Sequence, residues 1–144
     1  MEGNLATPAG FTKVAPYGPF HDLVGPMYTA DREGKIVMGF RVEEKHHNKG
    51  AAVHGGMFLM LADTAMTHAG VQVRPPGTSI VTTALSSEFM APARKGDWVE
   101  AEVDVLRAGR SVVFLACLIR RDGPEGPLLM RASATFQVVG KRTG

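Results

Sequence analysis

The chain has 144 residues, of which 44% are hydrophobic and 21% charged, with a formal net charge of +2. This size fits one domain with a hydrophobic core, and the small, scattered charge gives no indication of nucleic-acid binding. No apolar stretch is long enough to cross a bilayer, and the prolines and glycines of the first twenty residues leave no apolar core for a signal peptide. The single cysteine, Cys117, excludes an intrachain disulfide and favours a reducing, cytoplasmic setting.

The N-terminal part is expected to begin irregularly and to continue with short elements. We expect an irregular arm over residues 1–19, followed by one domain over residues 20–144. Residues 19–23 are compatible with a short helix, which must end at Gly25-Pro26 because proline cannot continue a helix. Two strands are expected at residues 26–29 and 35–42, with a turn at residues 31–34 between them.

Residues 54–70 form the one convincing long helix of the sequence. Apolar side chains recur on nearly all sides of it, which indicates a helix surrounded by protein rather than one lying on a surface. These apolar positions are Met57, Phe58, Leu61, Ala62, Ala65 and Met66.

The C-terminal half is expected to consist of strands. Residues 98–107 alternate between apolar and acidic side chains, as a half-buried strand does, and Ala108-Gly109 reads as a two-residue hairpin turn. The fold class is therefore α+β, with a largely antiparallel sheet wrapped around one long central helix. The four strands are expected at residues 78–90, 98–107, 110–121 and 128–139.

The start of the long helix carries the strongest chemical signal. His54-Gly55-Gly56 leads into the helix, where unpaired backbone N–H groups and the positive end of the helix dipole favour negative charge. Asp63 lies within the apolar helix, where a carboxylate is costly to bury without a purpose. Together these residues predict polarisation of a carbonyl and activation of a water, which is the chemistry of acyl-ester hydrolysis.

Each of these residues also has a purely structural interpretation. His54 could be simply a helix cap that is hydrogen-bonded to the backbone. Asp63 could be a core carboxylate that is hydrogen-bonded to Thr64 or Asn48. Function is the better interpretation of Asp63 only because the upstream motif is present.

Other reactive side chains are expected to be structural. His46 and His47 lack the cysteine or carboxylate pattern of a zinc site, so loop histidines that hydrogen-bond to the backbone are the better interpretation. Cys117 lies in an apolar run and is expected to be a buried thiol rather than a nucleophile.

The spacing of the helix residues predicts a site shared between two subunits. Gly56 and Asp63 lie on nearly the same side of the helix but about 10 Å apart along its axis, too far to touch one carbonyl together. A two-fold dimer with antiparallel helices would place the Asp63 of one subunit beside the Gly55-Gly56 end of the other.

Several segments match the motifs of a known family at the same spacings. They are His46-x-Asn48, His54-Gly55-Gly56, Leu61-Ala62-Asp63-Thr64-Ala65, Phe89-Met90-Ala91-Pro92 with Gly96-Asp97, and Arg107-x-Gly109-Arg110-Ser111. In these segments the chain, from about residue 20 to residue 139, resembles the hotdog-fold acyl-CoA thioesterases of the PaaI-like (phenylacetic acid degradation) type. HGG alone is a weak signal, whereas the complete set is specific.

The resemblance implies a role for each matching residue. Asn48 and the Gly55 N–H would polarise the thioester carbonyl with His54 beside them, and Asp63 of the neighbouring subunit would act as general base or nucleophile. Thr82, or Thr83 if the strand is offset by one residue, would help to place the water. The residues expected to bind substrate or CoA, some through its phosphates, are Gly56, Met57, Arg107, Gly109, Arg110 and Ser111.

Two further expectations concern the loop before the helix and the acyl pocket. The family usually carries a glycine three residues after the asparagine, where this chain has Ala51, so we expect a different bend there. The acyl pocket is expected between two subunits, with Met57 and Leu61 in its wall.

The resulting prediction is a cytoplasmic acyl-CoA thioesterase that acts without a metal or an organic cofactor and has no nucleic-acid or membrane partner. A homodimer would be its minimal unit, and the resemblance implies a homotetramer. Two rivals stay open: a hotdog hydratase or dehydratase, whose motifs the HGG and Asp63 arrangement does not resemble, and a non-catalytic acyl-CoA-binding module.

Overall fold

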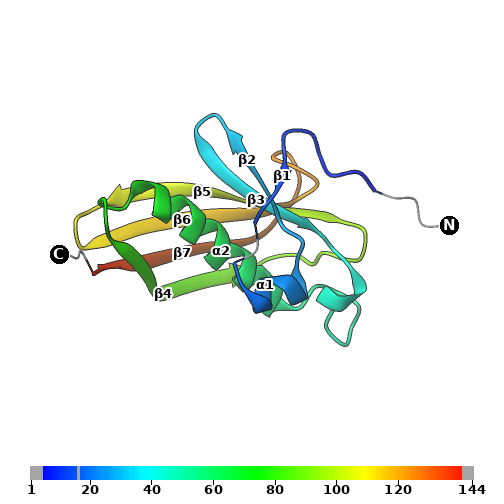
Figure 1. The fold of residues 1–144 in the computed structure, drawn as a ribbon. Coiled ribbons are helices and arrows are strands. Elements are labelled where there is room, and N and C mark those ends of the chain that lie inside the picture. Colours follow the sequence, from blue (N-terminus) through cyan, green and yellow to red (C-terminus); the bar gives the residue numbers. More distant parts are fainter. Residues whose placement is uncertain (1–4, 16, 141–144) are drawn as a thin grey trace.

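A long helix, α2 (Gly55–Val73), packs across one face of an antiparallel sheet in the computed structural model, which describes residues 5–15 and 17–140 (Figure 1). In this part of the chain the sheet has seven strands in the order β1-β2-β3-β5-β6-β7-β4. The predicted α+β architecture is therefore confirmed. The remaining elements are β1 (Thr12–Lys13), α1 (Pro19–Val24), β2 (Tyr28–Arg32), β3 (Lys35–Arg41), a 3-10 turn (Glu44–His46), β4 (Ser79–Phe89), β5 (Trp98–Ala108), β6 (Val112–Arg121) and β7 (Leu128–Val139).

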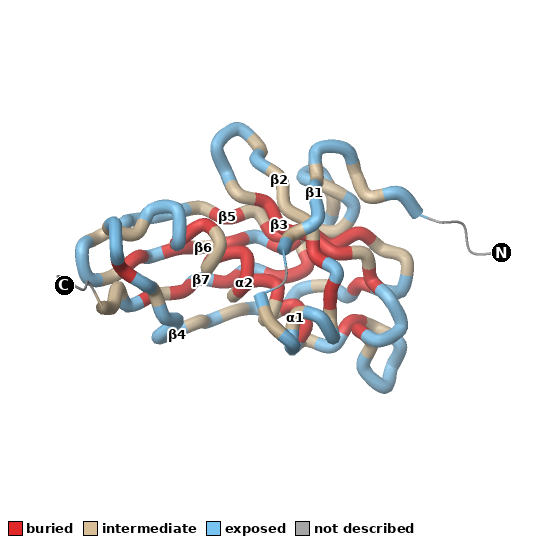
Figure 2. Tube along the Cα trace, viewed as in Figure 1, coloured by how far each residue is buried: buried red, intermediate tan, exposed pale blue. Residues whose placement is uncertain are grey.

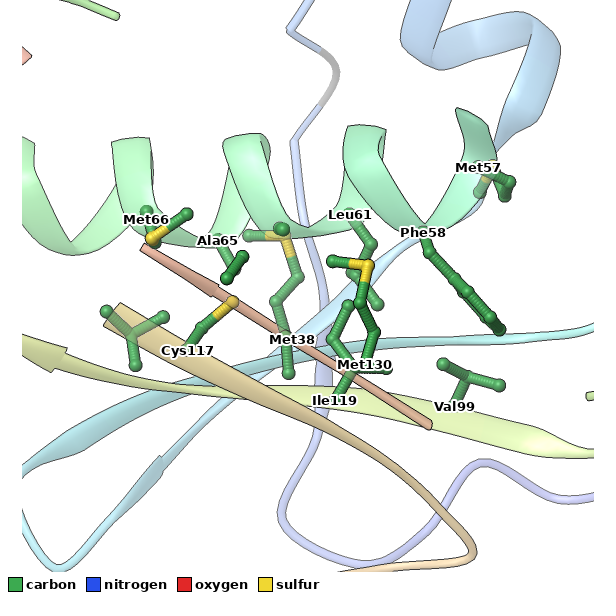
Figure 3. Packing of buried hydrophobic residues seen from close by; sticks show 14 of the residues in the cluster. Met38, Met57, Phe58, Leu61, Ala65, Met66, Val99, Cys117, Ile119 and Met130 are labelled. Carbon is green, nitrogen blue, oxygen red and sulfur yellow. The ribbon is translucent and has the colours of Figure 1, made fainter. Parts of the chain in front are cut away.

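The hydrophobic core lies between α2 and the sheet. Phe58, Leu61 and Met66 point from the helix toward strand residues such as Met130 and Ile119 (Figure 3). Burying each large apolar side chain of this kind stabilises the fold by about 1.5–3 kcal/mol, which is why the helix follows its apolar pattern onto the sheet. All six apolar helix positions that the sequence indicated are buried.

One side of α2 nevertheless stays accessible, so the prediction of a helix enclosed all round is wrong within a single chain. Asp63 and Thr67 are half-buried and Val71 is 40% exposed, and these residues lie along one stripe of the helix. This open stripe lies on the side that carries Asp63.

The N-terminal segment is more ordered than the predicted irregular arm. Thr12 and Lys13 pair with β2 and add a short strand to the sheet edge, and α1 begins at Pro19 and ends before Gly25-Pro26 as expected. The strand expected at residues 26–29 is shifted to Tyr28–Arg32. The reason is the turn at Glu33-Gly34, where φ values of 54° and 84° give the two-residue hairpin turn that matches the twist of the strands.

The turn between β5 and β6 lies two residues beyond its predicted position. The Gly109 N–H donates to Val112 O at 2.9 Å, so Arg110-Ser111 forms the tip instead of Ala108-Gly109. The register shifts between Val105 and Arg107, and the extra residue in this bulge lengthens β5 relative to β6. The last strand, β7, has the predicted bounds.

Strand β4 forms one edge of the sheet and pairs only with β7 among the described strands. Most of its residues are exposed, as the pale colours along it show in Figure 2. An edge strand of eleven residues presents a row of backbone N–H and C=O groups without partners, which favours pairing with another strand. No helix within the described residues is long and apolar enough to span a membrane.

Candidate functional site

Helix α2 begins directly after His54, because this residue caps it. With φ −61° and ψ 134°, His54 stands outside the helix, and its Nδ1 accepts a hydrogen bond of 2.8 Å from the Gly56 N–H. The Met57 N–H donates to His54 O at 2.8 Å. Within residues 5–15 and 17–140, the Gly55 N–H donates no hydrogen bond. This N–H group is therefore the donor that the helix start offers to a ligand, whereas the N–H of Gly56 is already used.

An aromatic side chain from β4 packs against this helix start. The ring of Phe89 stacks on Phe58 with centroids 6.4 Å apart, and a Cβ added to Gly55 would lie 3.3 Å from it. The glycine thus permits the close approach of the ring. Phe89 is 50% exposed and forms an apolar wall beside the Gly55 N–H. In the sequence, Phe89 is part of a segment that matches the family, but no role could be assigned to it. An aromatic residue at the end of a strand does not by itself indicate a place beside a functional site.

Asp63 is held by β4 and not by the partners that the structural interpretation proposed. Thr82 Oγ1 donates a hydrogen bond of 2.7 Å to Asp63 Oδ1. Thr64 instead contacts His21 Nε2 at 3.1 Å, deep beside α1. The neighbouring Thr83 bonds to Thr135 on β7, so Thr82 is the threonine that the fold brings to the carboxylate.

Asn48 shapes the loop before α2. Its Oδ1 accepts hydrogen bonds from the N–H groups of Gly50 and Ala52, at 2.8 and 3.3 Å. Only the amino group of this amide is left for a substrate. Ala51 in the same loop has φ 63°, a conformation that glycine adopts without strain and that is unfavourable for alanine.

The hairpin that carries the predicted CoA-binding residues lies far from the helix start of the same chain. The backbone O of Ser111 in this hairpin accepts a hydrogen bond from the Val138 N–H on β7. The next residue, Val139, pairs with Ser79, so the hairpin lies near the beginning of β4. The Gly55 end of α2 lies at the other end of β4, beside Phe89 (Figure 1). Thr82 and Phe89 are seven positions apart on β4, which corresponds to about 23 Å along the strand. Arg107 and Arg110 are exposed there, while Gly109 is required by the turn because a Cβ would lie 2.8 Å from Val112 O.

The predicted site residues therefore form three groups within one chain. The first is the helix start, the second is the pair of Asp63 and Thr82, and the third is the β5–β6 hairpin. Asp63 lies about 10 Å along the helix from Gly56, so the first two groups of one chain cannot act on the same carbonyl.

Two cavities flank α1. One, of about 330 Å³, lies between α1 and the segment before it and is lined by Tyr17, His21 and Thr64. The other, of about 230 Å³, reaches His54, Gly56 and Met57 at the start of α2. The larger cavity reaches none of the predicted site residues, whereas His54, Gly56 and Met57 line the smaller one, which therefore belongs to the candidate site. Leu61, expected in the acyl pocket, is fully buried in the core and lines neither cavity.

The histidines of the loop before α2 hold the backbone in place. His46 is buried; its Nδ1 accepts from the Glu43 N–H and its Nε2 contacts Val24 O at 2.6 Å. Burial lowers the pKa of His46, which favours the neutral ring. His47 Nε2 accepts from the Lys95 N–H. Across the described residues, no three His, Cys, Asp or Glu side chains are grouped to hold a metal ion.

The single cysteine is buried in the core. Burial raises the pKa of the Cys117 thiol to about 12, so it is not a thiolate near neutral pH. The expectation of a buried structural thiol is confirmed.

Comparison with known proteins gives a consistent picture. The sequence profile described as the thioesterase superfamily matches residues 50–127. A proposed esterase of Pseudomonas aeruginosa is 35% identical over 76% of this chain and 83% of its own length. Human acyl-coenzyme A thioesterase 13 is 30% identical over 56% of this chain and 57% of its own length. The PaaI protein of the E. coli phenylacetic acid degradation operon has the same fold, with a TM-score of 0.70, 22% identity and 80% of each chain covered.

Proposed function

The chain belongs to the thioesterase superfamily, a family of thioester hydrolases, and from that premise we propose that it hydrolyses an acyl-CoA thioester to the free acid and CoA. The observation that carries the proposal is the hydrogen-bonded pair of Asp63 and Thr82 on the open side of α2. A relative that is named an acyl-coenzyme A thioesterase supports CoA as the thiol part of the substrate.

The proposed chemistry uses the helix start to stabilise negative charge. The free Gly55 N–H, at the positive end of α2, donates to the thioester oxygen as it becomes an oxyanion, and the Asn48 amino group assists. One such donor is worth about 2.7–4 kcal/mol of barrier. His54 keeps the first turn of the helix in place through its bond to Gly56.

Asp63 supplies the second half of the chemistry in one of two ways. As a general base, it takes a proton from water while the water oxygen attacks the carbonyl carbon; the C–S bond then breaks and the CoA sulfur receives the proton. As a nucleophile, its carboxylate attacks the carbonyl carbon, the C–S bond breaks and the CoA thiolate leaves and takes up a proton; water then hydrolyses the resulting anhydride to the free acid and restores the carboxylate. Thr82 holds the carboxylate in either route.

A dimer would bring these parts together. Pairing of two β4 edges around a two-fold axis would set the two α2 helices antiparallel on the same side of a continuous sheet. An axis at the level of Leu59, midway between Gly55 and Asp63, would place each carboxylate opposite the partner's free N–H. The same symmetry would carry the hairpin with Arg107 and Arg110 toward the partner's helix start, where the CoA phosphates would bind.

The proposal also includes assembly into a homotetramer, a cytoplasmic location, activity without a metal or organic cofactor, and no nucleic-acid or membrane partner. The rival functions, hydration of an unsaturated acyl-CoA and binding of acyl-CoA without turnover, predict no release of thiol.

The experiment that tests the proposal is a thiol-release assay across aryl, short-chain and long-chain CoA esters. We expect the wild-type protein to hydrolyse at least one class and Asp63→Ala to lose about two to four orders of magnitude in kcat while keeping its fold and oligomeric state. Tight binding of the esters with no thiol release by the wild type would favour the binding module and overturn the proposal.

A further inference from the structure

We propose that the acyl group of the substrate binds in the 230 Å³ groove between α1 and α2, and that Phe20 and Met60 determine which acyl groups are accepted. This inference rests on the proposed function, because it assigns the acyl end of the same substrate. The groove begins at the candidate oxyanion site, since His54 and Gly56 are part of its wall.

The groove presents an apolar surface. Phe20 and Val24 of α1 face Met57 and Met60 of α2 across it. Met57 projects from the side of the first helical turn, away from the residues that pack on the sheet (Figure 3). Methionine side chains adapt their shape to a ligand, and 57% of Phe20 is exposed until something covers it.

The polar residues that line the groove already have partners. His46 uses both ring nitrogens on backbone groups, and His47 Nε2 accepts from Lys95 N–H. The Lys45 ammonium donates to Gly25 O at 2.6 Å, and His54 Nδ1 is bonded to Gly56. These interactions turn the polar atoms toward the backbone, so an apolar ligand would displace none of them.

Helix α1 forms the outer wall of the groove and is held there by hydrogen bonds. None of its residues is buried, so it does not collapse onto α2. Val24 O is fixed by His46 Nε2, and His21 Nε2 contacts Thr64 Oγ1 at 3.1 Å. These contacts keep a gap open between the two helices.

The volume sets the size of the acyl group. A cavity of about 150 Å³ is enough to bind benzene, so a groove of about 230 Å³ admits one aromatic ring with a short linker. The ring would lie beyond the carbonyl, on the side of α2 that carries Met57 and Met60.

The test compares two esters that differ only by a phenyl ring, phenylacetyl-CoA and acetyl-CoA. We expect Met60→Trp, which fills the groove, and Phe20→Ala, which removes its outer wall, to lower the ratio of kcat/KM for phenylacetyl-CoA to that for acetyl-CoA at least tenfold. Leu23→Ala is the matched control, because Leu23 is on the same short helix and 72% exposed but lies outside the groove. Its ratio should equal that of the wild type.

A binding measurement keeps the inference testable apart from turnover. The thioethers S-(2-phenylethyl)-CoA and S-ethyl-CoA cannot be hydrolysed, and calorimetry gives their affinities for each folded variant. We expect Met60→Trp and Phe20→Ala to weaken the phenylethyl compound at least tenfold more than the ethyl compound. Absence of thiol release with this binding pattern would refute only the proposed hydrolysis. Unchanged selectivity in both assays, or the same change in Leu23→Ala, would overturn the groove assignment.

Discussion

The hydroxyl of Thr82 donates to the carboxylate of Asp63 over 2.7 Å and so ties the edge strand β4 to helix α2. Thr82→Val keeps the shape of the side chain but removes this donor. We expect kcat for thioester hydrolysis to fall about 10- to 100-fold, because the carboxylate loses its fixed position. Thr83→Val is the matched control, since Thr83 bonds to Thr135 on the neighbouring strand. Equal losses of kcat in both variants would show that the activity depends on the structure of strand β4 and not on the hydrogen bond between Thr82 and Asp63.

The cap of α2 gives a second prediction. His54→Ala removes the acceptor of the Gly56 N–H and should lower the free energy of unfolding by about 1 kcal/mol, as loss of a helix cap does. His54→Asn supplies an acceptor again and should recover most of that stability in denaturant titrations. If His54→Asn is as unstable as His54→Ala, His54 does not act as a cap.

The loop before α2 contains a residue in an unfavourable conformation. Ala51 is exposed and has φ 63°, so Ala51→Gly relieves backbone strain without loss of packing. We expect a gain of about 0.5–1 kcal/mol in the free energy of unfolding. The neighbouring Ala52, whose φ is not positive, is the control: Ala52→Gly should destabilise by a similar amount. If Ala51→Gly lowered the free energy of unfolding as much as Ala52→Gly does, the backbone at Ala51 would not be strained.

The buried His46 makes stability depend on pH. Burial lowers its pKa in the folded state and outweighs the hydrogen bond to the Val24 carbonyl, which raises it; the charges of Lys45 and His47 also lower the pKa, and that of Glu43 raises it. The unfolded chain therefore takes up a proton near pH 6.5 that the folded chain does not, and the free energy of unfolding must fall as the pH drops through and below 6.5. His68, whose pKa burial also lowers, adds to this effect.

The check is a series of denaturant titrations between pH 7.5 and pH 5. We expect His46→Gln, which does not titrate, to be less stable than the wild type at pH 7.5 but to lose less stability on acidification. Leu23→Ala serves as an exposed reference with the slope of the wild type. Parallel curves for His46→Gln and the wild type would show that His46 does not titrate differently in the two states.

The sequence predicted those parts of the fold that depend on local patterns. The start of α2 follows from a capping residue and two glycines, and β7 has the bounds expected for the last strand, residues 128–139. The end of α2 lies beyond residue 70, where the sequence predicts the helix to stop. In the structure Gly70 lies inside the helix, where a Cβ would come within 2.7 Å of Ile80, and the helix continues to Val73 before Pro75. Close packing between distant segments left no local signal.

The candidate site was predicted unevenly for a similar reason. Asp63 and Gly55 stood out from chemistry and position, whereas Thr82 was indicated by the family resemblance and is separated from Asp63 by 19 residues. The groove beside α1 could not be predicted, because it depends on how His46 and Thr64 hold a short helix that buries nothing. Such spacing between elements is set by tertiary hydrogen bonds.

The central claim is that Gly55 of one subunit and Asp63 of the other form one site. Gly55→Pro removes the free N–H at the first helical position, where proline is tolerated, and His54 already has the extended ψ of 134° that a residue before proline prefers. Gly55→Ala is its control, because it adds a Cβ near Phe89 but keeps the N–H. We expect Gly55→Pro to lose about 100-fold or more in kcat and Gly55→Ala to lose far less.

The most direct measurement is the thiol-release rate of a mixture made by co-expressing equal amounts of Gly55→Pro and Asp63→Asn, each inactive alone. If the site is shared, random pairing makes half of the dimers mixed, and one of the two sites in each mixed dimer has both groups intact. The mixture should then recover about one quarter of the wild-type activity. A mixture that contains mixed dimers yet stays as inactive as its parents would contradict the shared site.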